Sequence, residues 1–325
     1  GNDMKQDWAT PLEKTEKTLE RWKDRTLSVK GKTVILQTYA IATIMYLASI
    51  FPIPEGCVNR LHKACFQFLW NHKNELIARA TCHLPWSQGG LVIPDFHVIR
   101  TIATLKWIKH LINKEAQAVW LDYGRYWTGQ ALGCVKMEWQ WLRSNLVPHG
   151  DPGKAPRWYA TVTTFVNQHK DSLSRLKDND LNTRTLKKLI QQPHQPRCVA
   201  EWRHITKHKL QIPWNTLWKS RCNNRVKEFL WKLSHRVLTT KAYLRRWGMT
   251  VSPECPFCPY REDEYHALLQ CHRAQTMWNG IQPILTAIAG QIIPIKMETL
   301  VFREGIPTGD PVNELCFVII ATAAA

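Results

Sequence analysis

The sequence predicts a mostly α-helical protein in which a helical bundle is followed by a second helical domain. Hydrophobic residues make up 44% of the chain and fall in blocks of helix length, so a packed core is expected rather than general disorder. Within these blocks the apolar residues recur at three- and four-residue steps, as on one face of a helix. A length of 325 residues is enough for two domains.

Residues 1–146 are predicted to form the first domain. The expected helices cover 11–29, 33–54, 55–71 and 96–113. The first of them has Pro11 near its first turn, where proline is well tolerated. Residues 78–95, which contain the Gly89-Gly90 pair, are expected to form a loop or a small hairpin.

The segment 33–54 is the stretch that most resembles a membrane span. Polar residues interrupt it, and Pro52 ends it after about eighteen residues, whereas a span needs roughly 20 apolar residues. A buried helix is therefore predicted instead, and no membrane is expected among the partners.

Residues 199–325 are predicted to form the second domain. The stretch 147–157 is rich in proline and glycine, and we assign 147–198 as a connector between the domains. One helix face of the second domain is formed by Val226, Phe229, Leu230 and Leu233. A further helix is expected over 273–289.

The net charge of +18 indicates a polyanionic partner. A protein this basic binds nucleic acid most often and an anionic membrane surface less often. A solvated basic face that only aids solubility is the open alternative. The chain also has 16 tryptophans, and cations combined with aromatic rings suit phosphates and stacked bases. We therefore expect nucleic acid, RNA and/or DNA, as the partner.

Basic residues concentrate between Trp202 and Pro253, where twelve of them stand against one acid, Glu228. The candidate nucleic-acid-binding residues are Arg203, Lys207, Lys219, Arg221, Arg225, Lys227, Lys232, Arg236, Lys241, Arg245 and Arg246. The aromatic residues interleaved with them are Trp202, Trp214, Trp218, Trp231, Tyr243 and Trp247. We expect such rings to stack on bases, although core packing is the better explanation for Trp218 and Trp231.

A second basic group borders the first two predicted helices. It consists of Arg21, Lys23, Arg25, Lys30 and Lys32. The acids Glu13, Glu16, Glu20 and Asp24 dilute it, so surface salt bridges explain much of this group.

The stretch "ECPFCPYREDEYHALLQC" carries the spacing of a metal site. Its candidate ligands are Cys255, Cys258, His266 and Cys271. Two cysteines three apart suit a tight turn, and a His and a Cys five apart suit a short helix. Four soft ligands describe a closed tetrahedral zinc site, which stabilises a fold, whereas a catalytic zinc keeps one position open. His272 is a weaker candidate ligand, and chance proximity of the four residues is the open alternative.

Other features bear on location and catalysis. Seven further cysteines lack regular spacing, as expected of free thiols in a reducing compartment, and the first residues are polar, so an intracellular location in nucleus and/or cytoplasm is expected. A phosphate-binding glycine loop, a nucleophile elbow and an adjacent Asp pair are all absent from the sequence. Asp178 and Asp180 are interpreted as a turn and a helix cap. We expect no enzyme activity from this chain.

Two regions resemble the C-terminal part of the reverse transcriptase of LINE-type (non-LTR) retrotransposons. The first includes "LEKTEKTLERWKDRTLSVKGKTVILQTYAIATIMYLASIFPIPEGCVNRLHKACFQFLWN" and "LPWSQGGLVIPDF". It is similar to the segment after the polymerase palm, where a thumb-like helical region begins. The second runs from Trp214 through "VKEFLWKLSHRVLTTKAYLRRWGM" to Trp278, and it resembles the reverse-transcriptase zinc-binding domain.

The resemblance implies a thumb-like region over 1–146 and a structural Zn²⁺ held by Cys255, Cys258, His266 and Cys271. It also implies an upstream palm and endonuclease, a truncated C-terminus, and hence a fragment or degenerate copy. The rest of the polyprotein would then be a partner. The expected function is non-catalytic gripping of template RNA or target DNA. A zinc-stapled protein-interaction module and a host-recruited nucleic-acid-binding fragment are the alternatives.

Overall fold

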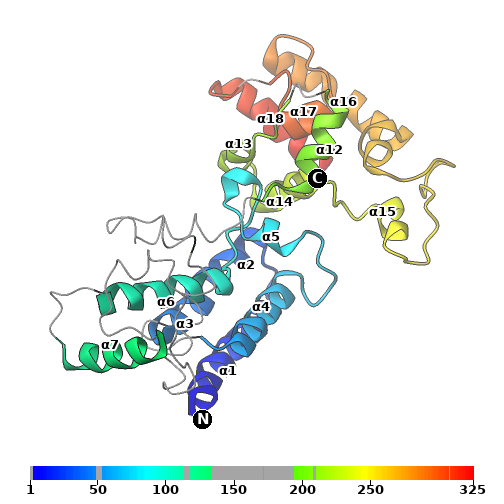
Figure 1. Cartoon of the computed structure of the whole chain (residues 1–325). Coiled ribbons are helices and arrows are strands. Elements are labelled where there is room, and N and C mark those ends of the chain that lie inside the picture. Colours follow the sequence, from blue (N-terminus) through cyan, green and yellow to red (C-terminus); the bar gives the residue numbers. More distant parts are fainter. Residues whose placement is uncertain are drawn as a thin grey trace. The chain divides into compact units, whose positions relative to one another are not determined.

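Figure 1 presents the protein as a computed structural model, in which residues 3–48, 53–112, 118–132, 171, 194–207, 210–306 and 308–325 are described. These residues are mostly helical, as the sequence predicts. Strand pairing among them is limited to one isolated bridge between Glu254 and Arg261. None of the described helices combines the length and the apolar character that crossing a membrane requires.

The chain divides into two compact units. The N-terminal unit comprises residues 1–24, 35–72 and 94–193, and the C-terminal unit comprises residues 25–34, 73–93 and 194–325. Two short segments from the first half of the sequence therefore belong to the unit that carries the Cys-Cys-His-Cys motif. The predicted connector lies almost entirely outside the described residues, so the linker at 147–157 stays a prediction.

The N-terminal unit is built from α1 (Asp3–Lys23), the π-helical turn η1 (Leu36–Ala40), α3 (Ile41–Ala48), α4 (Glu55–Leu69), α6 (Phe96–Ile112) and α7 (Val119–Leu132). α1 packs on α3 and α4, and α6 packs on α4 and α7 (Figure 1). α1 buries one stripe, consisting of Trp8, Leu12, Thr15 and Leu19. Arg60 donates two hydrogen bonds of 2.6 Å to the Glu16 carboxylate and so joins α4 to α1.

Two predicted helix boundaries in this region are wrong. The first helix begins at Asp3 and ends at Lys23, with Pro11 inside it, instead of covering 11–29. The Pro11 carbonyl accepts a hydrogen bond of 2.9 Å from the Thr15 hydroxyl. The apolar helix begins earlier than predicted, at Val29 in α2 (Val29–Ile35), and continues through η1 into α3.

This apolar helix is also less buried than predicted. Its inward stripe is formed by Leu36, Ala40, Ile44 and Ala48. Its outward side exposes Val34, Tyr39, Met45 and Tyr46, so it is an amphipathic helix of the molecular surface rather than a fully buried one. The next helix follows the prediction closely, because α4 buries its expected face, which consists of Val58, Leu61, Cys65, Phe68 and Leu69.

The C-terminal unit contains α5 (Arg79–Cys82), the 3₁₀ turn η2 (Trp86–Gln88), α12 (Arg197–Ile205), α13 (Trp214–Lys219), α14 (Asn224–Ser234), α15 (Lys241–Arg246), the π-helical turn η5 (His266–Gln270), α16 (His272–Ala289), α17 (Met297–Phe302) and α18 (Pro311–Ala324). α14 packs on α13, α17 and α18 and buries Val226, Leu230 and Leu233, as its periodicity predicts, while Phe229 is half-buried.

The Gly89-Gly90 pair is buried within this unit. The Gly89 carbonyl accepts hydrogen bonds from Trp231 Nε1 at 2.9 Å and from His235 Nε2 at 2.8 Å. Gly89 has a φ of 83°, and a Cβ built there would lie 2.7 Å from the Trp214 ring, so only glycine fits. Residues 78–95 form short helical turns and loop rather than a hairpin, and this loop docks on α14 through Gly89.

His235 is buried beside this loop as a neutral imidazole. Burial lowers its pKa to about 4. Its ring stacks on Trp214, with ring centroids 4.8 Å apart. With Nε2–H donating to Gly89, the Nδ1 atom is left to accept from the Cys198 thiol, 3.3 Å away. Burial raises the pKa of Cys198 to about 12, so this thiol stays protonated.

We expect the unfolding free energy of the C-terminal unit to fall below pH 6.5 because of His235. The unfolded chain binds this proton near pH 6.5 and the folded chain only near pH 4, so stability is lost as pH falls through that window. The loss is about 2 kcal/mol at pH 5. Urea unfolding at pH 7 and pH 5 measures it, and His235→Gln should remove this part of the pH dependence. An equal pH dependence in the variant would contradict the assignment.

Candidate metal centre and basic surface

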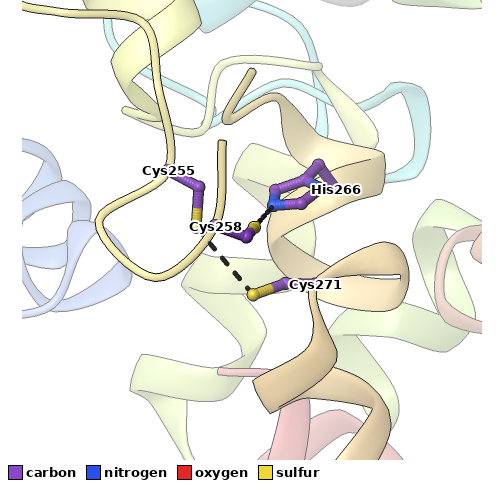
Figure 2. Close-up of side chains that lie close together, drawn as sticks. All are labelled: Cys255, Cys258, His266 and Cys271. Atoms are coloured by element: carbon purple, nitrogen blue, oxygen red, sulfur yellow. Dashed lines mark hydrogen bonds between the residues drawn. The ribbon is translucent and has the colours of Figure 1, made fainter. Parts of the chain in front are cut away.

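Four side chains converge on one point in the C-terminal unit. The ligand atoms of Cys255, Cys258, His266 and Cys271 all lie within 4.8 Å of one another. Cys258 Sγ lies 3.0 Å from His266 Nε2, and Cys255 Sγ lies 3.9 Å from Cys271 Sγ. Figure 2 shows the four side chains pointing toward one another, two from a loop and two from the helical segment that follows. The cluster predicted from the spacing is therefore assembled in space.

The loop that carries the first two cysteines is held by its own backbone. The Cys255 N–H donates to the Tyr260 carbonyl at 2.8 Å, and the Glu262 N–H donates to the Pro253 carbonyl at 2.8 Å. These bonds close a short turn around Cys258. A tight turn of this kind presents two thiols to one side, which is why the pair is separated by only two residues.

The other two ligands come from a π-helical turn. Asp263 Oδ1 accepts the His266 N–H at 2.9 Å and orients the start of η5. The Cys271 N–H donates to the His266 carbonyl at 2.8 Å, a bond that spans five residues. This wider turn, rather than an α-helical one, places His266 and Cys271 on the same side. The sequence predicted a short helix here, and the structure specifies its type.

The start of α16 favours a thiolate at Cys271. The backbone N–H of Arg273 is the main cause that lowers the pKa of this thiol, and the N–H of Ala274 acts in the same direction. N–H groups at a helix start stabilise thiolates in general. His272, the weaker candidate ligand, is exposed and is not part of the cluster.

The cluster can hold a metal ion. Three thiolates and one imidazole are the donor set of structural zinc sites, and four protein ligands complete a tetrahedral shell. The residues present therefore fit zinc. In this role the four side chains would tie the loop at 255–258 to the start of α16 and stabilise the fold between them.

The eleven predicted nucleic-acid-binding residues fall into two classes. Seven of them are exposed and form no ion pair with another described residue. These seven, which we call the free cations, are Arg203, Lys207, Lys219, Arg221, Arg225, Arg245 and Arg246. Together they keep the positive charge available to a polyanion.

The other four residues are engaged within the protein. Lys227 is buried, and burial lowers the pKa of its amine, so this side chain offers little charge to a ligand at the surface. Lys232 pairs with Glu228 at 2.7 Å. Lys241 Nζ donates to the Glu254 carbonyl at 3.0 Å. The Arg236 side chain lies over the Trp202 ring and near two carboxylates, those of Glu201 (3.5 Å) and Glu264 (3.8 Å).

The aromatic residues between the basic ones do not form a stacking surface. Five of them are buried, namely Trp202, Trp214, Trp218, Trp231 and Tyr243. Trp202 Nε1, for example, donates to the Ser234 carbonyl at 2.8 Å. Only Trp247, which is 48% exposed, presents a ring to solvent among the six. Core packing of Trp218 and Trp231 is as predicted, whereas the expected stacking role does not fit the buried Trp202, Trp214 and Tyr243, because a small helical unit uses its large rings to fill the core.

The second basic group is split between the two units. Lys23 belongs to the N-terminal unit and pairs with Glu20 at 2.7 Å, as predicted for surface salt bridges. Lys30 and Lys32 instead belong to the C-terminal unit, where Glu228 Oε2 accepts the backbone N–H of Val29 at 2.8 Å. Sequence reasoning missed this docking of residues 25–34 on α14. The single acid in a long basic stretch was the signal that could have found it.

Comparison with known proteins supports the assignment of Cys255, Cys258, His266 and Cys271 to a metal site. Residues 177–278 match a family described as zinc-binding in reverse transcriptase, and this range contains all four residues of the metal cluster. A protein of Arabidopsis thaliana that is provisionally named a ribonuclease H protein is 20% identical over 344 residues, which cover 84% of this chain. The chain spans about half of that relative, 55% of its length. The predicted resemblance of this region to a reverse-transcriptase zinc-binding domain is thus confirmed.

Proposed function

We propose that the chain is the nucleic-acid-binding C-terminal portion of a LINE-type reverse transcriptase, and that it grips template RNA or target DNA through its C-terminal unit. The observation that carries this proposal is the set of seven free cations in the same unit as the zinc-type cluster. Cations without a carboxylate partner repel one another in the absence of a ligand, and phosphates relieve that repulsion.

The role of the proposed Zn²⁺ is structural. It would be held by Cys255, Cys258, His266 and Cys271, and by binding all four it would link two segments of the chain. We infer that the chain itself catalyses no reaction. A zinc-loaded preparation should neither extend a primed RNA template with deoxynucleotides and Mg²⁺ nor cut the RNA of an RNA–DNA hybrid. Activity in either assay would overturn this inference.

We expect the affinity for a single-stranded oligonucleotide to fall steeply with salt. If the seven free cations each neutralise one phosphate, the slope of log affinity against log salt is roughly −5. Affinity then falls roughly 10³-fold between 50 and 200 mM salt. Fluorescence anisotropy of a labelled oligonucleotide at several salt concentrations measures this slope.

Two arginines of α12 provide a matched comparison. Arg203 is a free cation, whereas Arg197 pairs with Glu201 at 3.0 Å. Arg203→Gln should reduce the slope by roughly 0.7, and Arg197→Gln should leave it nearly unchanged. Binding that is absent at 50 mM salt, or flat with salt, would refute the proposal. That result would favour a zinc-stapled protein-interaction module.

A further inference from the structure

A pocket of about 420 Å³ lies along α14 in the C-terminal unit, and we call it the α14 pocket. Its polar and aromatic lining includes Thr26, Ser28, Arg225, Phe229, Lys232 and Thr239. The α14 residues follow the spacing of one helix face, and the remaining wall comes from the segment at 26–28 and from the turn after α14. A volume of this size is typical of sites that hold small ligands.

The charges around the α14 pocket are unbalanced. Glu228 is its one lining acid, and both carboxylate oxygens are engaged, by Lys232 and by the Val29 N–H. Arg225 is a free cation, and Lys32 is buried nearby. Burial is the main cause that lowers the pKa of Lys32, and Lys232 lowers it further, while Glu228 opposes this shift. Among the described lining residues Glu228 and Lys232 offset each other, so Arg225 is left as the net positive charge of the pocket, which favours an anionic ligand.

The rest of the lining suits a nucleotide rather than a bare anion. The half-buried Phe229 ring forms part of the wall together with two leucines, and an aromatic ring is the common surface for stacking a base. Hydroxyls come from Thr26, Ser28 and Thr239. The Ser28 hydroxyl accepts the Gly31 N–H at 3.2 Å, which leaves its own proton for a ligand oxygen. Cation, ring and hydroxyl thus line one pocket.

We propose that the α14 pocket holds one nucleotide of a bound single strand, with its phosphate at Arg225 and its base against Phe229. This inference rests on the proposed function, because it gives the gripping surface a position where one unit of the strand is held. The two proposals predict different results. The free cations alone imply a uniform electrostatic surface, on which each cation contributes equally to binding. In the α14 pocket one cation and one ring act together.

The test uses the full zinc-loaded chain and a fluorescein-labelled 12-nucleotide single-stranded RNA at 150 mM salt. Arg225→Gln should weaken binding about tenfold, as expected for loss of a charge-assisted contact. Arg221→Gln is the matched control, because Arg221 is also an exposed free cation and does not line the pocket. It should weaken binding only about two- to threefold, the effect of one diffuse charge.

Phe229→Leu tests the ring separately from the charge. It should weaken binding about tenfold without changing the salt slope, because stacking releases no counterions. A nucleoside 5′-monophosphate should compete for the pocket at lower concentration than inorganic phosphate does. Thermal unfolding of each variant verifies folding, and the exposed Arg225 keeps the test valid if Phe229→Leu unfolds.

The outcomes separate the two proposals. If the wild-type chain binds RNA but Arg225→Gln matches Arg221→Gln, the pocket assignment is overturned and the basic-surface function stands. Equal competition by phosphate and nucleotide would reject base recognition in the pocket. If the wild-type chain binds no RNA at 50 mM salt, both proposals fail.

Discussion

Replacing Cys255 with serine is expected to abolish stoichiometric zinc binding and to unfold the segment 255–271, which carries the four residues of the metal cluster. The first two ligands lie on a loop that short backbone bonds and one isolated bridge hold in place, so the metal would be its main crosslink. Zinc binding in small metal-stabilised modules supplies roughly 10–16 kcal/mol, most of which is folding free energy. Loss of one of four ligands removes a large part of it. Zinc content per chain and thermal unfolding measure the two effects.

His266→Ala should reproduce both effects, since His266 supplies the imidazole of the cluster. His272→Ala is the matched control, because this neighbouring histidine is exposed and lies outside the cluster. It should retain one zinc per chain and an unchanged unfolding temperature. Zinc content that stays the same in Cys255→Ser or His266→Ala would refute the ligand assignment.

Gly90→Ala is expected to destabilise the C-terminal unit by about 3 kcal/mol or more. A Cβ at Gly90 would lie 2.0 Å from the Leu84 carbonyl oxygen, which is far inside van der Waals contact. That carbonyl cannot move freely, because it accepts the Val92 N–H at 2.9 Å. The clash is therefore with fixed backbone rather than with the end of a flexible side chain. Urea unfolding of the zinc-loaded chain measures the loss.

Gly280→Ala, in the same unit, is expected to raise the free energy of unfolding instead of lowering it. Gly280 lies inside α16, and nothing is found within 4 Å of a Cβ built there. Alanine in a helix interior should stabilise by about 1 kcal/mol relative to glycine. If Gly90→Ala were as stable as the wild type, the close contact between Gly90 and the Leu84 carbonyl would be contradicted.

Features contained within one segment of the chain could be predicted from the sequence, and features that depend on distant segments could not. The helix faces of α4 and α14 and the extent of α16 could be predicted, because three- and four-residue periodicity is contained in one segment. The four candidate metal ligands could be identified from the sequence, because they lie within eighteen consecutive positions and so can meet in space in only a few ways. The start of α1 was missed, because Pro11 was interpreted as a first-turn residue although it lies inside the helix.

The candidate nucleic-acid surface was predicted less well. A count of basic residues cannot distinguish the free cation Arg225 from the buried Lys227, two positions away. Nor can it reveal that Trp231 donates to the Gly89 carbonyl, a residue from the other half of the chain. Which side of a helix faces the core depends on the partner that covers it, and that partner is distant in sequence.

The sequence by itself therefore determined the helical class, the set of candidate metal ligands and the excess of positive charge, since each is a property of composition or of short spacing. The tertiary structure decided that residues 25–34 and 73–93 join the C-terminal unit, that most of its tryptophans form the core, and that Arg225 and Phe229 share a pocket with Ser28. The physical reason is that burial and pairing depend on contacts between distant segments. One carboxylate on α14 illustrates this, because it caps a helix that begins almost 200 residues earlier, at a separation of 199.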